Sequence, residues 1–277
     1  CNTTRNREET LRQVMDEGVI LVTGGAVRIG REICLNLAND GFSVAVHYNS
    51  SSEQANSLVD IINSGGGRAL SFSGDLSDAS MVEGLFSDIR HSLGDVVGLV
   101  NNASLFSFDD INSVSEESWD SHMHVNALVP LLMISELNRN MPAGCVGSVV
   151  NILDQKISQP NPDYLSYTAS RYAMAGMTET LARSLCPSVR VNAVAPGHTL
   201  PSPEQTPEGF KKAQSQSPLQ SGPSPKDIAG AVNYLMSAKS VTGQIIYVDS
   251  GELFLSRARD VVFETEEAGK DSNGLKC

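Results

Sequence analysis

A glycine-rich turn near the start of the chain has the composition of a phosphate-binding loop. Residues 23–30 read TGGAVRIG, after the apolar run 19–23 and ahead of a helical pattern over 29–39. Glycines let the backbone approach a pyrophosphate, and the free N–H groups and dipole of the following helix face its negative charge. Any sharp strand-to-helix turn can use glycines, but a position on the first strand of an alternating series favours a nucleotide site.

Two polar side chains in a later helical pattern are placed to act together. Tyr167 and Arg171 lie four residues apart, so they project from the same face of a helix. A phenol can exchange a proton with a bound molecule. A guanidinium supplies positive charge and hydrogen-bond donors, but it stays protonated and cannot pass a proton on.

These residues are carried by strands that alternate with helices. Apolar runs predict strands at 19–23, 43–48, 69–73, 96–101, 147–153, 189–194 and 244–248. Helical patterns lie between them, at 29–39, 53–63, 81–93, 114–140, 164–185 and 224–237. The last pattern begins with Ser224 and Pro225, residue types that open helices. The alternation predicts an α/β fold, a single doubly wound Rossmann domain with a seven-stranded, mainly parallel sheet.

The domain occupies residues 19–254, and polar segments flank it. Residues 1–18 form a polar N-terminal extension, and residues 255–277 form a polar C-terminal tail that we expect to be loosely held. Within the domain, residues 198–223 are rich in Pro, Ser and Gln. A loop of this length in a compact domain is usually functional or disordered. A substrate lid and a disordered surface insert are both compatible with its composition.

The charge balance excludes several classes of partner. The 277 residues carry 20 Lys and Arg against 32 Asp and Glu, a formal net charge of -12. Nucleic acids and anionic membrane surfaces are bound largely by clustered basic residues, so we expect neither as a partner. No stretch reaches the roughly 18 apolar residues of a membrane span, and residues 1–18 lack the apolar core of a secretory signal. We therefore expect a cytoplasmic protein, although a chain that begins with Cys is also compatible with a trimmed targeting peptide.

The sequence does not indicate a metal site. The 5 cysteines are widely spaced, with no Cys-x-x-Cys pair and no Cys/His cluster. His122 and His124 lie two residues apart in a helical pattern, so they point in different directions. We expect structural or surface roles for both histidines.

Several motifs in the right order make the chain resemble the short-chain dehydrogenase/reductase family. The family's T-G-x-x-x-G-x-G turn is matched by Thr23, Gly24 and Gly30, with Arg28 in place of the middle glycine. Further matches along the chain are Asp75-Leu76, Asn101-Asn102-Ala103, Asn126, Tyr167 and Pro196-Gly197. The resemblance covers residues 19–254 and implies an oxidoreductase that acts on a small molecule, uses a nicotinamide nucleotide and assembles as a homotetramer. It also implies that Asp75 contacts the adenine and that residues 101–103 line the ribose and nicotinamide.

The end of the second strand favours NADP(H) over NAD(H). A site for NAD carries an acid there for the ribose 2′-hydroxyl, whereas residues 47–52 read HYNSSS, with no carboxylate before Glu53. The serine hydroxyls and backbone N–H groups can receive a 2′-phosphate, although no Arg stands beside them. The residues expected to bind the cofactor are Gly24, Arg28, Ile29, Gly30, His47, Tyr48, Asn49, Ser50, Asp75, Leu76, Asn102, Ala103, Ser104, Pro196, Gly197 and Thr199.

The same resemblance implies that the catalytic residues are Tyr167, Asp154, Arg171 and Asn126. The family has Lys four residues after the Tyr, where it lowers the phenol pKa, holds the nicotinamide ribose and relays protons. This chain has Arg171 there, and no Lys occurs before Lys156. One interpretation is that Arg171 follows this general preference for Arg and leaves a slower but working site. The other is that catalysis is lost and nucleotide binding is retained.

Asp154 stands where the family usually has a Ser, thirteen residues before Tyr167. A carboxyl beside a phenol suits protonation of a ring nitrogen better than polarisation of a ketone. The alternative is an acid that only caps the end of a strand.

A further set of residues resembles one branch of the family, the pteridine reductases. The matches are Arg28, His47-Tyr48, Asn102-Ala103-Ser104-x-Phe106, Asp154, Tyr164 and Thr199. By this resemblance Phe106 stacks on a flat pterin opposite the nicotinamide, and Asp154 with Tyr167 delivers protons. The implied substrate-binding residues are Arg28, Ser104, Phe106, Asp154, Tyr164 and Tyr167. The alternative for Phe106 is a loop anchor in the core, and the branch usually has an Arg where Ser50 stands.

Together these features predict NADPH-dependent reduction of an oxidised pterin, of the dihydropterin or biopterin type, or of a similar planar C=N compound. Hydride would come from the nicotinamide and protons from Tyr167 and Asp154. One alternative is a short-chain reductase that acts on a ketone. The other is a catalytically silent NADP-binding regulatory protein, in which Arg171 has replaced the working Lys.

Overall fold

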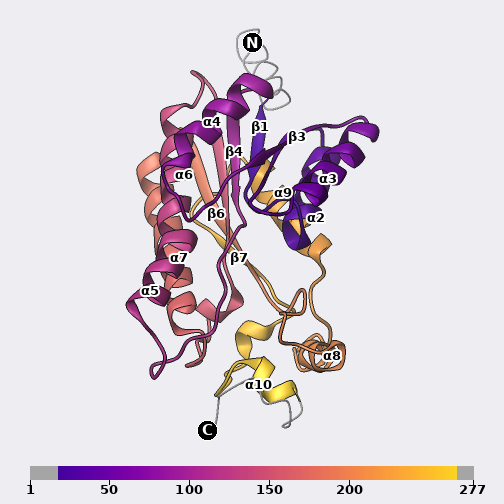
Figure 1. The fold of residues 1–277 in the computed structure, drawn as a ribbon, viewed down its shortest axis with the longest axis vertical. Helices are drawn as coiled ribbons and strands as arrows, with labels where there is room; N and C mark the ends of the chain where they lie inside the picture. The colour runs from indigo at the N-terminus through magenta and orange to yellow at the C-terminus, as the bar shows by residue number, and fades with distance from the viewer. Residues whose placement is uncertain (1–17, 267–277) are drawn as a thin grey trace.

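Short apolar runs form one parallel sheet in the computed structural model, which describes residues 18–266 (Figure 1). The strands are β1 (Val19–Val22), β2 (Ser43–Tyr48), β3 (Arg68–Ser73), β4 (Val96–Asn101), β5 (Gly147–Ile152), β6 (Val189–Pro196) and β7 (Ile245–Val248). Their order across the sheet is β3-β2-β1-β4-β5-β6-β7, and every pair of neighbours is parallel. The strand order reverses between β1 and β4, as in doubly wound folds. The predicted seven-stranded α/β fold is confirmed, with the sheet parallel throughout.

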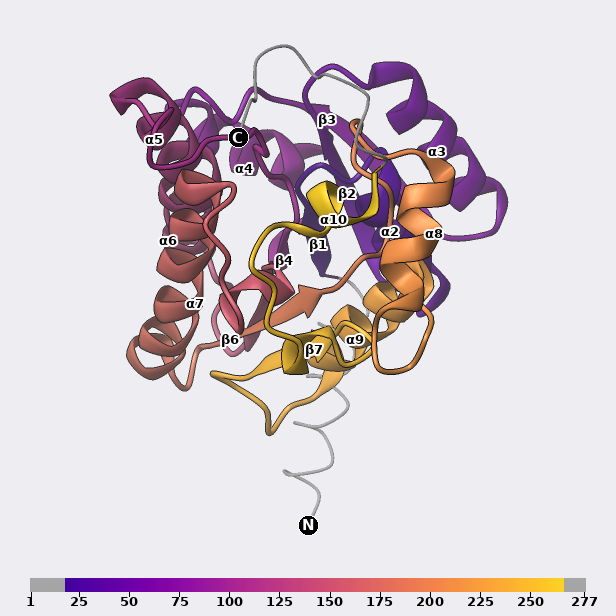
Figure 2. The ribbon, with the colours of Figure 1, turned by 90° about the horizontal axis from the view of Figure 1, so that it is seen from below.

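Helices cover both faces of the sheet, as Figures 1 and 2 show from two directions. One face carries α2 (Arg28–Asn39), α3 (Ser52–Ser64) and α9 (Pro225–Ser237). The other carries α4 (Met81–Ser92), α6 (Val129–Arg139) and α7 (Leu165–Leu185). Successive residues of a strand point to opposite faces, so Val22 joins the first core and Leu21 the second. Ser224 caps α9 as its residue types predict, in a reciprocal bond with Asp227.

The predicted helix over 114–140 is divided in the structure. It consists of α5 (Glu116–Met123), a single π-helical turn η1 (His124–Leu128), and α6. The wider π turn holds Asn126 fully buried, where its amide bonds both backbone groups of Leu105 and the hydroxyl of Ser170. The apolar periodicity of α5 and α6 does not reveal this interruption, because π turns add one residue without changing composition.

Two segments lie across the carboxyl edge of the sheet, at the lower end of the molecule in Figure 1. Residues 198–223 are ordered and contain α8 (Pro207–Ser215), which does not fit the disordered-insert alternative. After the short turn η3 (Glu252–Phe254), the chain returns to pack α10 (Val261–Thr265) against α8. The expectation of a loosely held tail is therefore wrong for residues 255–266, because ion pairs and two buried valines attach them. Residues 1–17 and 267–277 of the two polar extensions lie outside the described residues.

Within residues 18–266, no helix combines the length and apolarity that crossing a bilayer requires.

A buried histidine joins the first glycine turn to the third strand. His47, at the end of β2, is 1% exposed, and its Nδ1 accepts the backbone N–H of Gly24 at 3.2 Å. Its Nε2 lies 3.1 Å from the carbonyl oxygen of Gly74. A carbonyl only accepts, so Nε2 carries the hydrogen and the ring is neutral. Burial lowers the pKa of His47 to about 4, against a weaker opposing effect of the Gly74 bond.

This depressed pKa predicts a loss of stability in acid. In the unfolded chain, His47 takes up a proton as the pH falls below its ordinary pKa of 6.5. In the folded chain it does so only as the pH reaches about 4. The free energy of unfolding therefore falls as pH falls through this window. Urea titrations at pH 7 and pH 4.5 should show the wild type losing about 2.5 kcal/mol more than His47→Gln. His91→Gln, at an exposed position, is the control for the loss of a histidine from the surface.

Candidate active site

The carboxyl edge of the sheet forms a cleft of about 710 Å³. Its walls come from the turn after β1, the loop after β4, the turn η2 (Gln155–Ile157), the start of α7, the loop after β6 and the start of α10. The residues expected to bind substrate all lie on these walls: Arg28, Ser104, Phe106, Asp154, Tyr164 and Tyr167. Their approach follows from parallel strands, whose carboxyl ends meet at one edge.

The turn after β1 leaves no room for a side chain at its glycines. Gly24 adopts a left-handed φ of 59°, and a Cβ on Gly30 would lie 2.2 Å from the carbonyl oxygen of Gly24. The Asn102 amide donates to the carbonyl oxygens of Thr23 and Gly24, which fixes the turn against the loop after β4. Arg28 also has a left-handed φ, of 54°, and its exposed guanidinium donates to the Pro201 carbonyl oxygen. The turn thus presents bare backbone with one cation at its rim.

A carboxylate and a phenol meet at the centre of the cleft. The Tyr167 hydroxyl donates to Asp154 Oδ2 at 2.9 Å, while Asp154 Oδ1 accepts the backbone N–H of Lys156 and begins η2. Asp154 therefore caps a turn, as one interpretation expects, and also holds the phenol. Burial raises the pKa of Tyr167 above its ordinary value, and the charge of Asp154 adds to this while Arg171 opposes it. The phenol is thus a protonated hydrogen donor near neutral pH.

Arg171 lies beneath Tyr167 on the next turn of α7. Its guanidinium carbon is 4.9 Å from the centroid of the Tyr167 ring, and Nη1 donates to the Ile152 carbonyl oxygen at 3.2 Å. The side chain is buried, and its Nε has no hydrogen-bond partner among residues 18–266. Arg171 therefore supplies a fixed positive charge against the ring, and the N–H of its Nε is an unused donor among the described residues.

Aromatic rings form the wall beside this pair. Phe106 stacks on Tyr164 with centroids 4.4 Å apart and planes 18° from parallel, and it meets Tyr167 edge-on at 4.8 Å. Tyr164 is held in a left-handed conformation, φ 56°, at the start of α7. Phe106 is 41% exposed, so it is a wall residue and not the core anchor of the alternative interpretation. Whether it stacks on a ligand stays a prediction.

The remaining expected cofactor residues divide between this cleft and a second one. Ile29, Pro196, Gly197 and Thr199 line the first cleft, and Ser104 with Ala103 lines both. The second cleft, of about 970 Å³, includes His47, Asn49, Asp75 and Leu76 on its walls. Two expected residues line neither: Tyr48 is partly buried against the core that α2, α3 and α9 cover, and Ser50 is exposed in the loop after β2. The Asn126 amide bonds the backbone of Leu105 and the Ser170 hydroxyl.

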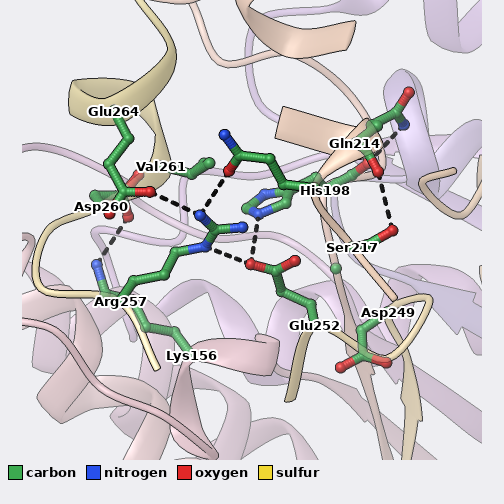
Figure 3. A network of polar contacts seen from close by, with 12 residues as sticks. Lys156, His198, Gln214, Ser217, Asp249, Glu252, Arg257, Asp260, Val261 and Glu264 are labelled. Atoms are coloured by element: carbon green, nitrogen blue, oxygen red, sulfur yellow. Dashed lines mark hydrogen bonds and ion pairs between the residues drawn. The ribbon is translucent and has the colours of Figure 1, made fainter. Parts of the chain in front are cut away.

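Part of the cleft is built by residues that the sequence analysis missed. Lys156, in η2, is 4% exposed and reaches Asp260 Oδ2 at 2.9 Å, as Figure 3 shows. Arg259 bonds the Asp163 carboxylate at 2.9 Å. These partners lie 104 and 96 positions apart. The sequence feature that could have indicated these contacts is the pair of basic residues Arg257 and Arg259 in a polar segment. That feature does not show which acidic residues they bind.

A second group of contacts links this returning chain to the loop after β6. Glu252 is 2% exposed, and its Oε1 meets Arg257 Nε at 2.5 Å and His198 Nε2 at 3.3 Å. Arg257 also reaches Glu264 in α10 at 2.7 Å (Figure 3). Burial alone would raise the pKa of Glu252, but His198 and Arg257 outweigh it and hold the pKa below its ordinary value. Glu252 is therefore a buried anion that ties residues 198–223 to α10.

Comparisons with known proteins match this architecture. A family model described as enoyl-(acyl carrier protein) reductase matches residues 25–252. The 3-oxoacyl-[acyl-carrier-protein] reductase FabG of Staphylococcus aureus is 31% identical over 236 residues, 83% of this chain and 96% of that protein. FolM alternative dihydrofolate reductase 1 from Brucella suis, solved in complex with NADP, is 39% identical with a TM-score of 0.84, over 88% of this chain and 98% of that one. A blue fluorescent protein from a metagenomic library, in complex with NADPH, is 30% identical with a TM-score of 0.78, over 84% and 97%.

These matches extend over the segments that build the cleft. The family model begins inside the glycine turn and ends at the buried anion Glu252. The relatives align along nearly their whole length, so the similarity is not confined to the nucleotide-binding half. The resemblance inferred from the motifs is confirmed at this level, and the chain belongs to the short-chain dehydrogenase/reductase family of oxidoreductases.

Proposed function

We propose that the chain is an NADP(H)-dependent reductase of a pterin or a similar planar C=N compound. The observation that carries this proposal is the bond between Tyr167 and Asp154, 2.9 Å long, beside the aromatic wall of Phe106 and Tyr164. A carboxyl paired with a phenol suits a basic ring nitrogen, and flat aromatic walls suit a planar heterocycle. The similarity to two FolM alternative dihydrofolate reductases, both solved with NADP, supports the same class of substrate.

The residues around the glycine turn fit such a cofactor. The turn admits only backbone at Gly24 and Gly30, which lets a pyrophosphate approach its N–H groups. Arg28 at the rim can meet a phosphate, and the buried Nε of Arg171 is a spare donor for a ribose hydroxyl. Bound NADPH would supply the hydride.

The chain's own residues supply the proton and the orientation. Asp154 accepts the hydrogen bond of Tyr167, so the phenol hydroxyl is aimed and the carboxyl can pass on a proton. Arg171 stays protonated and stabilises negative charge that develops on the phenol, but it does not relay protons. Phe106 and Tyr164 hold one side of a planar ligand and exclude water from it.

Arg171 also favours a second candidate, a nucleotide-binding protein without turnover. Its guanidinium packs on the Tyr167 ring and bonds the backbone, so neither group of this pair offers a base that exchanges protons rapidly. The two candidates share the cofactor and differ in whether hydride leaves it.

We further propose that copies of the chain associate, as a homotetramer, through the helical surface that borders the second cleft. Its walls include Met123, Leu128, Leu131 and Met177 from α5, η1, α6 and α7. Leu128 is 43% exposed on this surface, and Tyr172 is 44% exposed on α7. Apolar side chains gathered on adjoining helices are typical of an interface.

Changing Asp154 to Ser should separate pterin from ketone chemistry. Serine can polarise a carbonyl but cannot protonate a ring nitrogen as a carboxyl does, so dihydrobiopterin turnover should fall about 100-fold while ketone turnover is kept. The loss of NADPH absorbance measures the turnover of both substrates, and Tyr167→Phe is the control variant that loses both activities. Because the pKa of Tyr167 is raised, wild-type turnover should show no loss from phenol ionisation up to about pH 10. If Asp154→Ser lowered the turnover of the two substrates equally, this would contradict the proposed role of Asp154 in protonating a ring nitrogen.

Changing Arg171 to Lys should raise the turnover of dihydrobiopterin, on the order of tenfold, because an ammonium can relay protons. NADPH affinity, measured by fluorescence, should stay within about threefold. Arg139→Lys, on the exposed side of α6, is the matched control. An unchanged rate would show that proton relay does not limit the wild type. A wild type that binds NADPH tightly but turns over no substrate would support the silent candidate.

Changing Leu128 to Asp should dissociate the assembly, because a charge in an apolar interface is left without a partner. Multi-angle light scattering of the wild type should give about four chains and of the variant fewer. Ile111→Asp, exposed in the loop after β4, is the control. A wild type that runs as a monomer would contradict this proposal.

A further inference from the structure

Three buried polar side chains meet behind the aromatic wall. Asp109, from the loop after β4, His122, from α5, and Ser166, in the first turn of α7, are each at most 2% exposed. The Ser166 hydroxyl bonds Asp109 Oδ2 and lies 2.6 Å from His122 Nδ1. None of these residues belongs to the cleft described above.

The hydrogen bonds of this cluster run in one direction, with each group donating to the next. His122 Nδ1 lies 2.9 Å from the Ser118 carbonyl oxygen, which only accepts, so Nδ1 carries the hydrogen. Nε2 is then the acceptor, and it receives the backbone N–H of Ser107 at 3.3 Å. The one Nδ1 hydrogen is shared between the Ser118 carbonyl oxygen and the Ser166 hydroxyl, which in turn donates to Asp109. A continuous chain of bonds therefore runs from Ser107 to the Asp109 carboxylate.

The Asp109 carboxylate ends this chain at the N-terminus of α7. Its Oδ1 accepts the Ser166 N–H at 3.0 Å, and its backbone carbonyl accepts the N–H of Leu165 at 3.1 Å. A negative charge at this position is stabilised by the helix dipole. The cluster thus contains one carboxylate, with a neutral imidazole beside it.

Ser, His and Asp also form hydrolase triads, but this cluster is built differently. In a triad the carboxylate holds the imidazole, whereas here Asp109 holds Ser166 and His122 lies beyond it. His122 and Ser166 are fully buried, so no substrate reaches the hydroxyl. The cluster connects chain segments and does not provide a nucleophile.

The segments that it connects carry the two halves of the proposed site. Ser107 adjoins Phe106, while Ser166 adjoins Tyr167. The His122 ring also meets the Tyr167 ring nearly edge-on, with centroids 6.2 Å apart. We propose that His122 is a positioning residue, which sets the distance between the Phe106 wall and the proton donor Tyr167. This proposal rests on the proposed reduction of a planar substrate.

Two substitutions of His122 separate positioning from simple packing. In His122→Asn the amide is short and overlays Nδ1, so the Ser166 bond is kept and the Ser107 bond is lost. In His122→Gln the longer amide overlays Nε2, so the Ser107 bond is kept. We expect His122→Asn to raise the KM for dihydrobiopterin about tenfold with kcat within about twofold, and His122→Gln to stay within about threefold of wild-type KM. NADPH affinity should be unchanged in both variants.

A second measurement does not depend on turnover. Hydrogen exchange of the segment 104–108 should be faster in His122→Asn than in the wild type or His122→Gln, because the Ser107 amide has lost its acceptor. Ile134→Val, on the buried face of α6, controls for lowered stability and should leave both KM and exchange unchanged. Equal KM and exchange in the Asn and Gln variants would overturn the proposal. If the wild type reduces no pterin, the proposed function fails, and exchange of residues 104–108 alone decides the positioning role.

Discussion

Parallel pairing of neighbouring strands is the constraint on which the site depends. Each strand enters the sheet from the same end, so the segment that follows it leaves at the same edge. The glycine turn after β1, Asn102 after β4, Asp154 after β5 and Gly197 after β6 consequently face one cleft. An antiparallel strand among these would carry its following residues to the opposite edge. The shared direction of the strands therefore brings the segments that carry the site residues together at one edge of the sheet.

Burial widens the pH range over which two groups near this edge stay neutral. It lowers the pKa of His47 and raises that of Tyr167, so both are neutral near pH 7. In both cases the neutral form has a definite hydrogen donor, aimed at Gly74 in one and at Asp154 in the other. Beside Tyr167, the guanidinium of Arg171 supplies a positive charge against the ring. This edge of the sheet thus combines oriented neutral donors with the positive charges of Arg171 and Arg28, which suits proton donation to a bound molecule.

Local patterns predicted those features that depend on neighbours in sequence. The bounds 43–48 and 96–101 agree with β2 and β4, because each strand is an apolar run with polar residues beside it. The glycine turn and the four-residue spacing of Tyr167 and Arg171 are likewise local, and the structure places them together. The π turn at Asn126 was missed, because it depends on the buried backbone of Leu105. The partners of Asp260 and Arg259 were missed for a similar reason, since each lies about a hundred positions away.

The C-terminal segment shows why polar composition was misleading there. Ion pairs such as Lys156–Asp260 contribute little net stability, because desolvation offsets most of their attraction. Val261 and Val262 are at most 7% exposed, and burying each contributes roughly 1.5–3 kcal/mol. Val262 packs with Tyr164 and Tyr167, so its burial attaches the segment to the wall of the cleft. Lys156 Nζ also lies over the Tyr164 ring, 5.0 Å from its centroid. A ligand that displaces Tyr164 must therefore disturb both Val262 and the Lys156–Asp260 ion pair. The aromatic wall of the cleft and the C-terminal segment packed against it therefore move together.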